Sequence, residues 1–477
     1  MFDYCVIGAG VVGGLIAREL TRYTGSVVLV ERESDVAMGA TRANSAIVHA
    51  GFDAHEGTLK ARLNVRGAAM MPALTKELGV RYDPCGSLVV GFSEEDRKTL
   101  SELLTRGERN GVPGLKLLDR EQVLAMEPNI GDGVTCALYA PTGAIVCPYE
   151  LCLSAVGSAM DNGAELRLDF EVTSLTRTDG GYIVRAADGR EVSAACVINC
   201  AGVYSDRVAR MAGDDRFTVT PRRGEYMLLD RECGSLVSHT IFRCPSAMGK
   251  GILVTPTVDG NLLLGPTAEN ISDKEDTATT AQGIALVRRQ AAEQVKNIPF
   301  GKVITSFAGL RSVGSTGDFI IDMKDNFVNV AAIESPGLSS SPAIARYVTD
   351  LLRAGGKVLT PRADFHPERA AYHAFRDMSE QEKSEVIRRD PSYAHVVCRC
   401  EVVTEGEIRA AIRRNPKPRD IDGIKRRTRA TMGRCQGGFC TPVLVKILAE
   451  ECGIPEDAVT KSGGASRLNV GKTKQEV

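Results

Sequence analysis

The chain has 477 residues, of which 43% are hydrophobic and 25% charged, and its net charge is −1 at pH 7. This length predicts two to four domains, and the near-neutral charge gives no general reason to expect nucleic acid as a partner. No apolar run approaches the roughly 18 residues of a membrane span, and the first residues lack a secretory signal. We therefore expect a cytoplasmic protein whose fourteen cysteines are reduced, so that clustered cysteines indicate metal binding or catalysis.

The first thirty residues carry a dinucleotide-binding pattern. An apolar strand (4–7) is followed by a turn containing Gly8, Gly10, Gly13 and Gly14, a helical pattern (11–22) and a second strand (26–30) ending at Glu31. Glycines in such a turn allow a tight bend, close approach of a pyrophosphate and close packing of the helix on the strand. The free N–H groups of the helix then face the phosphates. The pattern predicts a bound dinucleotide and leaves FAD and NAD open.

Helical and strand patterns then alternate along the chain. Helices are predicted at 59–78, 93–110, 148–160 and 280–295, and strands at 87–92, across 164–199 and 215–270, and at 327–332. The strands across 164–199 end in a small-residue turn at Ala201 and Gly202, and the last strand leads into a second turn at Gly337, Leu338, Ser339 and Ser340. Backbone N–H groups of that turn, which opens another helix, can meet an anion or a flavin carbonyl.

Near residue 362 the composition changes. Residues 363–394 are polar and are interpreted as a linker, 395–455 as a small helical domain with a capping box at Thr404–Glu407, and 456–477 as a polar tail. The small domain contains Cys398, Cys400, Cys435 and Cys440. Two close pairs of soft thiolate ligands indicate a metal centre. A C-x-C pair suits one iron of a two-iron cluster better than a single zinc ion, so [2Fe–2S] is favoured over zinc and over free thiols.

Ten basic side chains lie in residues 409–434, with only Asp420 and Asp422 opposing them. This stretch has three interpretations: stabilisation of an anionic cluster, docking of an acidic redox partner, or an ordinary solvated face. The other ten cysteines are interpreted as small core residues.

Three segments together resemble the FAD-dependent oxidoreductase family that includes D-amino-acid oxidase and glycerol-3-phosphate dehydrogenase: the glycine turn with Glu31, the loop from Asn44 to His49, and Gly337–Ser340. The last domain resembles bacterioferritin-associated-ferredoxin domains, which carry [2Fe–2S]. The combination is similar to the catalytic subunits of anaerobic glycerol-3-phosphate dehydrogenases, which pass electrons through partner subunits towards quinone. The resemblance implies α/β plus α+β architecture: a Rossmann-like FAD-binding domain (1–80, 145–210, 303–355) interleaved with a mixed-sheet substrate domain (81–144, 211–302).

The same resemblance implies the cofactor contacts. The pyrophosphate would lie at the glycine turn, the adenosine ribose at Glu31, adenine at Val172, and the isoalloxazine at the turn that begins with Gly337. The full set of implied FAD-binding residues is Gly8, Gly10, Gly13, Gly14, Glu31, Arg32, Thr41, Asn44, Ser45, Val172, Ala201, Gly202, Gly337, Leu338, Ser339 and Ser340.

Oxidation of a secondary alcohol requires removal of the hydroxyl proton, and His49 is the best candidate base, the alternative being a structural histidine. An anionic substrate requires fixed cations: Arg311 is the first choice because a guanidinium grips phosphate or carboxylate with two bonds. Lys250 is the second, and Arg223 and Tyr226 are weaker candidates. These groups suit sn-glycerol 3-phosphate or a 2-hydroxydicarboxylate equally.

We therefore expect an FAD-dependent dehydrogenase that oxidises sn-glycerol 3-phosphate and passes electrons through [2Fe–2S] to a partner subunit or quinone chain, with attachment to the inner face of the membrane only through that partner. An oxidase is disfavoured, because oxygen as acceptor would leave the cluster idle. One alternative is a dehydrogenase of L-2-hydroxyglutarate or another 2-hydroxy or 2-amino acid. A second is a non-catalytic electron-transfer subunit.

Overall fold

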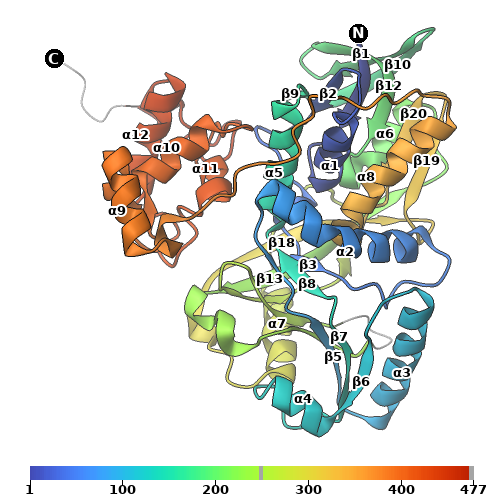
Figure 1. The fold of residues 1–477 in the computed structure, drawn as a ribbon, viewed down its shortest axis with the longest axis vertical. Helices are drawn as coiled ribbons and strands as arrows, with labels where there is room; N and C mark the ends of the chain where they lie inside the picture. Colours follow the sequence, from blue (N-terminus) through green and yellow to red (C-terminus); the bar gives the residue numbers. More distant parts are fainter. Residues whose placement is uncertain (246–250, 472–477) are drawn as a thin grey trace.

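The computed structural model describes residues 1–245 and 251–471 and shows a two-layered body with a smaller domain beside it (Figure 1). An eight-stranded sheet forms the upper half of the body, with strand order β10-β11-β12-β1-β2-β9, and β20 pairs with both β12 and β19. β1 is parallel to β2 and to β12, as expected for a dinucleotide-binding fold. The strands are β1 (Phe2–Ile7), β2 (Val27–Val30), β9 (Glu165–Arg167), β10 (Val172–Thr178), β11 (Gly181–Ala186), β12 (Glu191–Asn199), β19 (Ile320–Lys324) and β20 (Phe327–Ala331).

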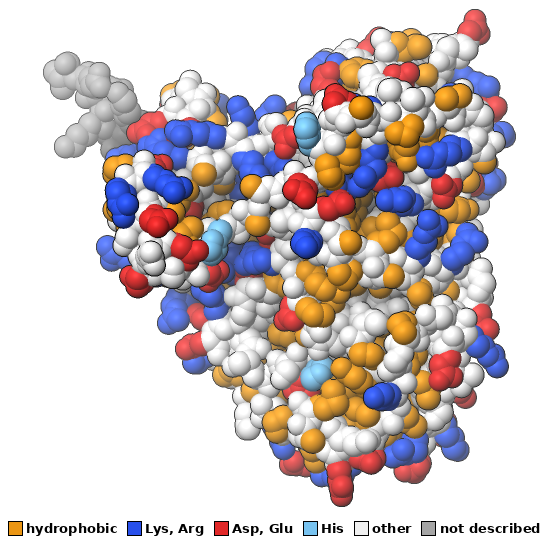
Figure 2. Space-filling view, in the orientation of Figure 1, with side chains coloured by type: hydrophobic (Ala, Val, Ile, Leu, Met, Phe, Trp, Pro, Cys, Tyr) orange, Lys and Arg blue, Asp and Glu red, His pale blue; other side chains and the backbone are white. Residues whose placement is uncertain are grey.

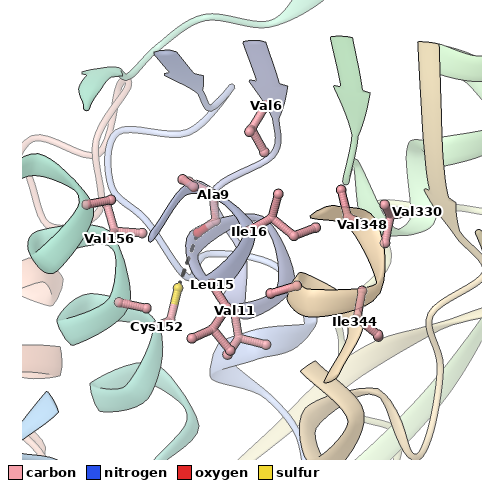
Figure 3. Close-up of a cluster of buried hydrophobic side chains, with 14 of the residues drawn as sticks. Val6, Ala9, Val11, Leu15, Ile16, Cys152, Val156, Val330, Ile344 and Val348 are labelled. Carbon is pink, nitrogen blue, oxygen red and sulfur yellow. Dashed lines mark hydrogen bonds between the residues drawn. The ribbon is translucent and has the colours of Figure 1, made fainter. Parts of the chain in front are cut away.

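Side chains alternate along the strands, so each face of this sheet has its own apolar cluster. Most of the helices pack on one face, and the helix Ser205–Met211 packs on the other. Val6 of β1 and Val330 of β20 point to the helical side, where they join Ile16, Val156 and Ile344 in one buried apolar cluster (Figure 3). Cys5 and Val28 point to the opposite face and belong to a second cluster. The helices of this half are α1 (Val11–Leu20), α2 (Leu59–Leu78), α5 (Pro148–Asp161), α6 (Ser205–Met211) and α8 (Gly337–Ala354).

A nine-stranded mixed sheet forms the lower half, with order β17-β13-β16-β15-β14-β5-β7-β6 and β18 along β13. Because β18 pairs with β13 over its length, this sheet extends beyond residue 302, the boundary that the sequence suggested. The strands are β5 (Ser87–Gly91), β6 (Lys116–Asp119), β7 (Cys136–Ala140), β13 (Val219–Leu229), β14 (Thr240–Arg243), β15 (Leu253–Pro256), β16 (Leu262–Gly265), β17 (Glu269–Asn270) and β18 (Val303–Gly314); the helices are α3 (Glu94–Arg109), α4 (Arg120–Met126) and α7 (Ala281–Gln294).

A three-stranded sheet, ordered β3-β8-β4, lies between the two halves (Figure 1). It places the segment that continues into His49 at the junction of the two large sheets. Its strands are β3 (Ile47–Val48), β4 (Tyr82–Asp83) and β8 (Ala144–Val146). The interleaved α/β and mixed-sheet architecture predicted from the sequence is confirmed.

The C-terminal domain, whose helices are drawn in orange and red in Figure 1, has a small apolar core of its own. The predicted capping box is present. The Thr404 hydroxyl accepts a hydrogen bond from the Glu407 N–H, and the Glu407 carboxylate accepts one from the Thr404 N–H. Part of the linker packs on this domain, since the Phe375 N–H donates to Glu407 Oε1 (2.8 Å). The elements are α9 (Glu380–Arg389), β21 (Val396–Cys398), β22 (Val403–Thr404), α10 (Glu405–Arg413), α11 (Ile421–Thr428) and α12 (Thr441–Cys452).

The start of the predicted polar tail is also packed. Val459 is fully buried, and the Ile421 N–H donates to the Thr460 carbonyl at the start of α11. Among residues 1–245 and 251–471, no helix is long and apolar enough to cross a membrane.

Candidate functional site

One cavity of about 2060 Å³ lies among the FAD-binding half, the mixed sheet and the C-terminal domain. It exceeds the ~300–1,000 Å³ of ordinary small-molecule pockets, so it has room for a long ligand and a substrate together. Of the predicted FAD-binding residues, its wall contains Gly8, Gly10, Gly13, Glu31, Arg32, Thr41, Asn44, Ser45, Val172, Ala201, Gly202, Gly337 and Leu338.

The glycine turn at one end of the cavity has no room for side chains. Gly8 has φ +103°, and a Cβ there would lie 2.4 Å from the Cys200 carbonyl oxygen. A Cβ on Gly13 would lie 2.0 Å from the Gly8 oxygen, so this glycine lets α1 pack against β1. Gly10 instead opens towards the cavity, where the neighbouring Val11 N–H donates to Thr41 Oγ1 (3.0 Å). The turn therefore offers backbone N–H groups to a phosphate group.

Gly14 lies outside the cavity wall. A Cβ at this position would lie 2.8 Å from Cγ2 of Val156. The structure therefore gives Gly14 a packing role between α1 and α5 rather than a cofactor contact.

Glu31 lies beside the glycine turn, where its carboxylate accepts hydrogen bonds from the N–H groups of Ala9 (2.7 Å) and Glu33 (3.1 Å). Burial raises the pKa of this carboxyl group, against the effect of these backbone donors. Arg32 lines the same end of the cavity and forms ion pairs with Glu33 (2.8 Å) and Glu275 (2.7 Å). Val172 lies in this part of the wall with its neighbour Glu171, where the resemblance implied the adenine.

The loop from Thr41 to Ser45 shapes the middle of the cavity. The Asn44 side chain donates to the Thr41 carbonyl (2.9 Å) and accepts from the Ala46 N–H (2.8 Å), so it fixes the loop. The Ser45 hydroxyl lies 3.2 Å from the Tyr226 hydroxyl, which joins this loop to the mixed sheet.

The second glycine-serine turn begins α8. Gly337 and Leu338 reach the cavity, whereas Ser339 and Ser340 are fully buried behind it. Ser339 Oγ accepts from the His49 N–H (2.7 Å), and this hydrogen bond holds the His49 segment against α8. The turn thus positions His49, and the two serines are displaced from the surface where the resemblance implied flavin contacts.

The His49 side chain enters the cavity beside this turn. Its Nε2 lies 3.4 Å from Ser335 Oγ, and its ring lies 5.7 Å from that of Phe242. The Asn64 side chain donates to the His49 carbonyl (2.6 Å) and fixes the backbone at this point.

Arg311 lines the same cavity from β18. Its Nη2 donates to the Thr267 carbonyl (2.6 Å), while its Nε has no hydrogen-bond partner within the part of the chain that the structure describes. Burial lowers the pKa of this guanidinium, and Tyr226 partly opposes that effect. A buried cation with donor capacity to spare is suited to an anionic ligand.

Two other predicted substrate contacts are placed differently. Lys250 lies outside the described residues. Arg223 is buried and paired with Glu269 (2.7 Å) and Asp276 (2.7 Å), which argues against a role in substrate binding. The cavity wall contains the preceding residue, Arg222, instead.

The strand geometry explains this difference. Side chains alternate between the faces of a strand, so Arg222 shares a face with Tyr226 rather than Arg223. Tyr226 and Leu228 of β13 line the cavity with Arg222, in agreement with a period of two. Applying that period to the predicted strand would have identified Arg222. Lys274 also lines the cavity and had no local pattern to mark it.

The four clustered cysteines meet in two pairs. The thiols of Cys398 and Cys440 interact with each other, and so do those of Cys400 and Cys435. Two pairs suit the two irons of a [2Fe–2S] cluster, whereas structural zinc requires four ligands around one ion.

Backbone donors surround these sulfurs. The N–H groups of Thr431 and Glu401 are directed to Cys398, and those of Gly437, Gly438 and Phe439 to Cys435. The pKa of Cys398 is lowered to about 6, chiefly by its hydrogen bond with Cys440. The same hydrogen bond raises the pKa of Cys440, so it divides the two thiols of the pair, while the N–H···S bonds favour an anionic iron–sulfur cluster.

The remaining cysteines are free thiols, and most are buried as predicted. Cys452 at the end of α12 is an exception to the core interpretation, because it is exposed.

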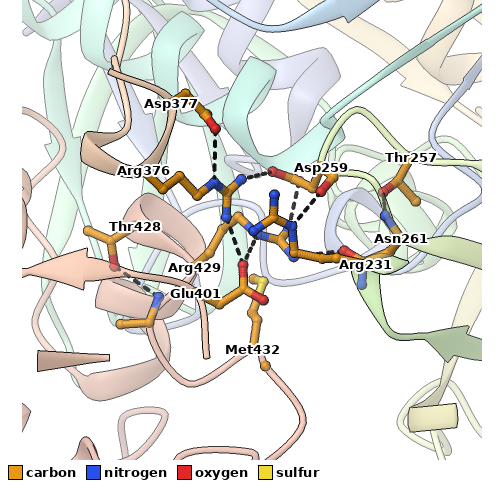
Figure 4. Close-up of polar contacts among 12 residues, drawn as sticks. Arg231, Thr257, Asp259, Asn261, Arg376, Asp377, Glu401, Thr428, Arg429 and Met432 are labelled. Carbon is orange, nitrogen blue, oxygen red and sulfur yellow. Dashed lines mark hydrogen bonds and ion pairs between the residues drawn. The ribbon is translucent and has the colours of Figure 1, made fainter. Parts of the chain in front are cut away.

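A buried network of ions joins the cluster domain to the mixed sheet (Figure 4). Asp259 binds Arg429 (2.7 Å), Arg376 (3.4 Å) and Arg81, and Glu401 binds Arg429 (2.8 Å) and Arg376 (2.9 Å). Asp259 and Glu401 are 6% and 1% exposed. Burial raises the pKa of Asp259, but the three arginines hold it below its usual range.

A second contact joins the cluster domain to the loop after β2. Asp35 binds Arg426 (2.6 Å) and Arg427 (2.8 Å). Lys and Arg side chains gather along this seam between the small domain and the body (Figure 2). Five of the ten basic residues of the stretch 409–434 pair with acidic residues of the body: Arg419, Arg426, Arg427, Arg429 and Arg434. Arg409 and Arg413 pair instead with Glu451 of the cluster domain, and Arg413, Arg419 and Arg434 are more than half exposed, so the solvated-face interpretation holds for part of the stretch.

Comparison with known proteins agrees with this geometry. Residues 3–351 match the family of FAD dependent oxidoreductases, and residues 396–450 match the BFD-like [2Fe-2S] binding domain. The chain belongs to the FAD-dependent oxidoreductase family and carries a [2Fe–2S] domain.

Three proteins similar to this chain illustrate the range of activities in the family. A glycerol 3-phosphate dehydrogenase of Caloramator mitchellensis is 46% identical over the whole of both chains. A structure of L-α-glycerophosphate oxidase from Mycoplasma pneumoniae with FAD bound gives a TM-score of 0.74 at 30% identity, covering 78% of this chain and 99% of that one. A mitochondrial L-2-hydroxyglutarate dehydrogenase of Pongo abelii is 30% identical and covers 73% of this chain and 87% of its own.

Both cofactors predicted from the sequence are thus supported, and the residues fit them. The glycine turn and Glu31 form a cradle at one end of a cavity large enough for FAD, and the paired thiols match a two-iron cluster. The protein is an oxidoreductase.

Proposed function

We propose that the protein oxidises sn-glycerol 3-phosphate to dihydroxyacetone phosphate and passes the electrons through its [2Fe–2S] domain to a partner subunit or quinone chain. The observation that carries this proposal is that His49, Arg311 and Arg222 line the same cavity as Gly337. A base and two cations in one cavity are what the dehydrogenation of an anionic alcohol requires.

In this proposal Arg311 and Arg222 hold the phosphate group and thereby orient the carbon chain of the substrate. His49 Nε2 accepts the proton of the secondary hydroxyl while the C–H electron pair leaves as hydride. FAD would be held by Gly8, Gly10, Gly13 and Glu31, and when bound it would supply the two-electron acceptor for this oxidation. The Ser339 hydroxyl keeps the His49 backbone in place through its bond to the His49 N–H.

The cluster domain supports a dehydrogenase rather than an oxidase. The glycerol 3-phosphate oxidase of Mycoplasma pneumoniae aligns with 73% of this chain and 94% of its own length. The dehydrogenase of Caloramator mitchellensis aligns with all of this chain, including the [2Fe–2S] domain. A one-electron carrier in the same chain suits an acceptor other than oxygen, and attachment to a membrane would be through the partner that receives the electrons.

The test is anaerobic reduction of the bound flavin by a panel of substrates. We expect glycerol 3-phosphate to bleach the flavin absorption, and His49→Ala to slow the bleaching about 100-fold or more, in line with the loss of a general base. If L-2-hydroxyglutarate bleaches the flavin and glycerol 3-phosphate does not, the substrate assignment is wrong. If His49→Ala reacts at the wild-type rate with every substrate, His49 is not the base.

A further inference from the structure

Three cations line the cofactor cavity where the cluster domain closes it. Arg42 directly follows Thr41, whose hydroxyl accepts from the Val11 N–H in the first turn of α1. Lys425 and Arg426 approach from α11 of the cluster domain, and all three side chains lie in the cavity wall. The proposed mechanism assigns no role to them.

Two of these cations lack a carboxylate partner. Within residues 1–245 and 251–471, the Lys425 side chain forms neither a hydrogen bond nor an ion pair, and the Arg42 side chain forms only a contact with Met38 Sδ (3.9 Å). The nearby Asp422 is already paired with Lys461 (2.8 Å). Arg426 is paired with Asp35, but its Nε is buried without a partner.

Two cations in this part of the wall are therefore without a direct contact to a carboxylate, although Asp422, Glu33 and Asp420 lie near Arg42. Burial lowers the pKa of Lys425 against the opposing effect of Asp422, and burial together with the neighbouring Arg426 lowers the pKa of Arg42 against the opposing effect of nearby carboxylates. Like charges held together in a partly buried cavity are unfavourable unless an anion joins them. The N-terminus of α1, reached through Gly10 and Thr41, contributes further partial positive charge on the same cavity.

We propose that Arg42 and Lys425 form a second phosphate-binding wall of the FAD site, so that the [2Fe–2S] domain completes the binding site of the flavin cofactor. The pyrophosphate of a dinucleotide carries two negative charges close together, which can pair with these two cations. The inference rests on FAD occupying this cavity and is independent of which substrate the enzyme oxidises.

One consequence concerns the docking of the two domains. If FAD binds Lys425, then α11 is held against the body both by the cofactor and by the ion pairs of Asp35. By thermodynamic linkage, FAD must then tighten the docking of the cluster domain by the same factor by which docking tightens FAD. Loss of FAD would leave Arg42, Lys425 and Arg426 repelling one another across the seam.

The test measures the affinity of the full-length protein for FAD after removal of the flavin, by titration with FAD and its fluorescence quenching. We expect Lys425→Gln and Arg42→Gln each to weaken FAD about tenfold, as for the loss of one charged hydrogen bond. The dependence of the affinity on salt concentration should fall in both variants. Lys425→Arg, which keeps the charge, should retain most of the affinity.

The control is Lys446→Gln, the same change at an exposed position on α12 of the same domain. It should leave FAD affinity unchanged, and the visible spectrum of the cluster verifies that each variant is folded. Wild-type affinity in Lys425→Gln, or equal weakening in Lys425→Arg and Lys425→Gln, would overturn the proposal. Neither result depends on turnover of glycerol 3-phosphate, so failure of the substrate assignment would be seen separately.

Discussion

The inside of the FAD-binding half and the seam between the body and the cluster domain are held together by different forces. Within the FAD-binding half, α1, α5 and α8 pack on the sheet through side chains such as Ile16, Val156 and Ile344, which are fully buried and apolar. The cluster domain has its own apolar core but meets the body through buried carboxylates, Asp35 and Asp259, surrounded by arginines. Apolar packing is insensitive to pH, whereas buried ion pairs depend on protonation and lose stability sharply when one partner is removed.

This contrast indicates that the flavin half stays folded when the cluster or its docking is disturbed. It also indicates that the docking of the cluster domain is more sensitive to single substitutions than the packing within the flavin-binding part. The following changes test both statements, in order of decreasing effect.

Cys400→Ser removes one ligand of the proposed two-iron pair. We expect complete loss of the [2Fe–2S] visible spectrum, because two pairs of thiolates are required for the two irons. Anaerobic flavin reduction by substrate should persist, while electron transfer to an external one-electron acceptor falls at least tenfold. A lower melting temperature of the flavin-binding part in this variant, measured with FAD in excess, would contradict its independent folding; FAD affinity itself is linked to the docking of α11.

Gly13→Ala places a methyl group 2.0 Å from the Gly8 oxygen, so the helix or the turn must shift. Overpacking of this kind costs about 1–3 kcal/mol, and the shift occurs where phosphate is bound. We expect most of the FAD to be lost on purification, as measured by the ratio of flavin to protein. Gly301→Ala, where a Cβ meets nothing within 4 Å, is the matched control and should keep its flavin.

Asp259→Ala leaves Arg81, Arg376 and Arg429 buried without this carboxylate. Breaking one partner of a buried ion network costs about 3–5 kcal/mol. Limited proteolysis of the linker, residues 363–394, should become much faster, while the flavin half keeps its melting temperature. Unchanged protection of the linker would show that apolar contacts hold the domain.

Acid pH should weaken the second contact. Burial alone would raise the pKa of Asp35, but Arg427 and Arg426 hold it at about 2. Because this pKa is depressed, the stabilisation is fully present above about pH 4 and is lost as the pH falls from about 4 towards 2, by ~2 kcal/mol in total. Small-angle scattering should show the domain separating in that window, and Asp35→Asn should show the same separation at higher pH.

Arg434→Ala removes a pair with Asp230 (3.2 Å) in which the arginine side chain is 68% exposed. An exposed ion pair is worth about 0–1 kcal/mol, so proteolysis of the linker should be close to wild type. A large effect here would mean that the seam depends on total charge rather than on its buried pairs.

Much of the fold could be predicted because its elements carry local patterns. The glycine turn, the period-two strands across 164–199 and the capping box at Thr404 all impose backbone geometry within a few residues. Arg223 was predicted at the substrate site, but the alternation of side chains along β13 places Arg222 in the cavity wall instead. The position of Ser339 behind the cavity could not be foreseen, because it depends on how α8 meets the segment that contains His49.

The sequence by itself determined the cofactor chemistry, because both cofactors require particular residue types at short spacings: glycines where a phosphate meets the backbone, and thiols where iron is bound. Only the tertiary structure decided how the two halves meet. Asp35 and Arg426 are 391 residues apart in the chain, and nothing in the neighbourhood of either marks the other. A buried ion pair forms only where both charged groups leave water and come into contact with each other. For Asp35 and Arg426 this happens only after the body and the cluster domain have folded and docked.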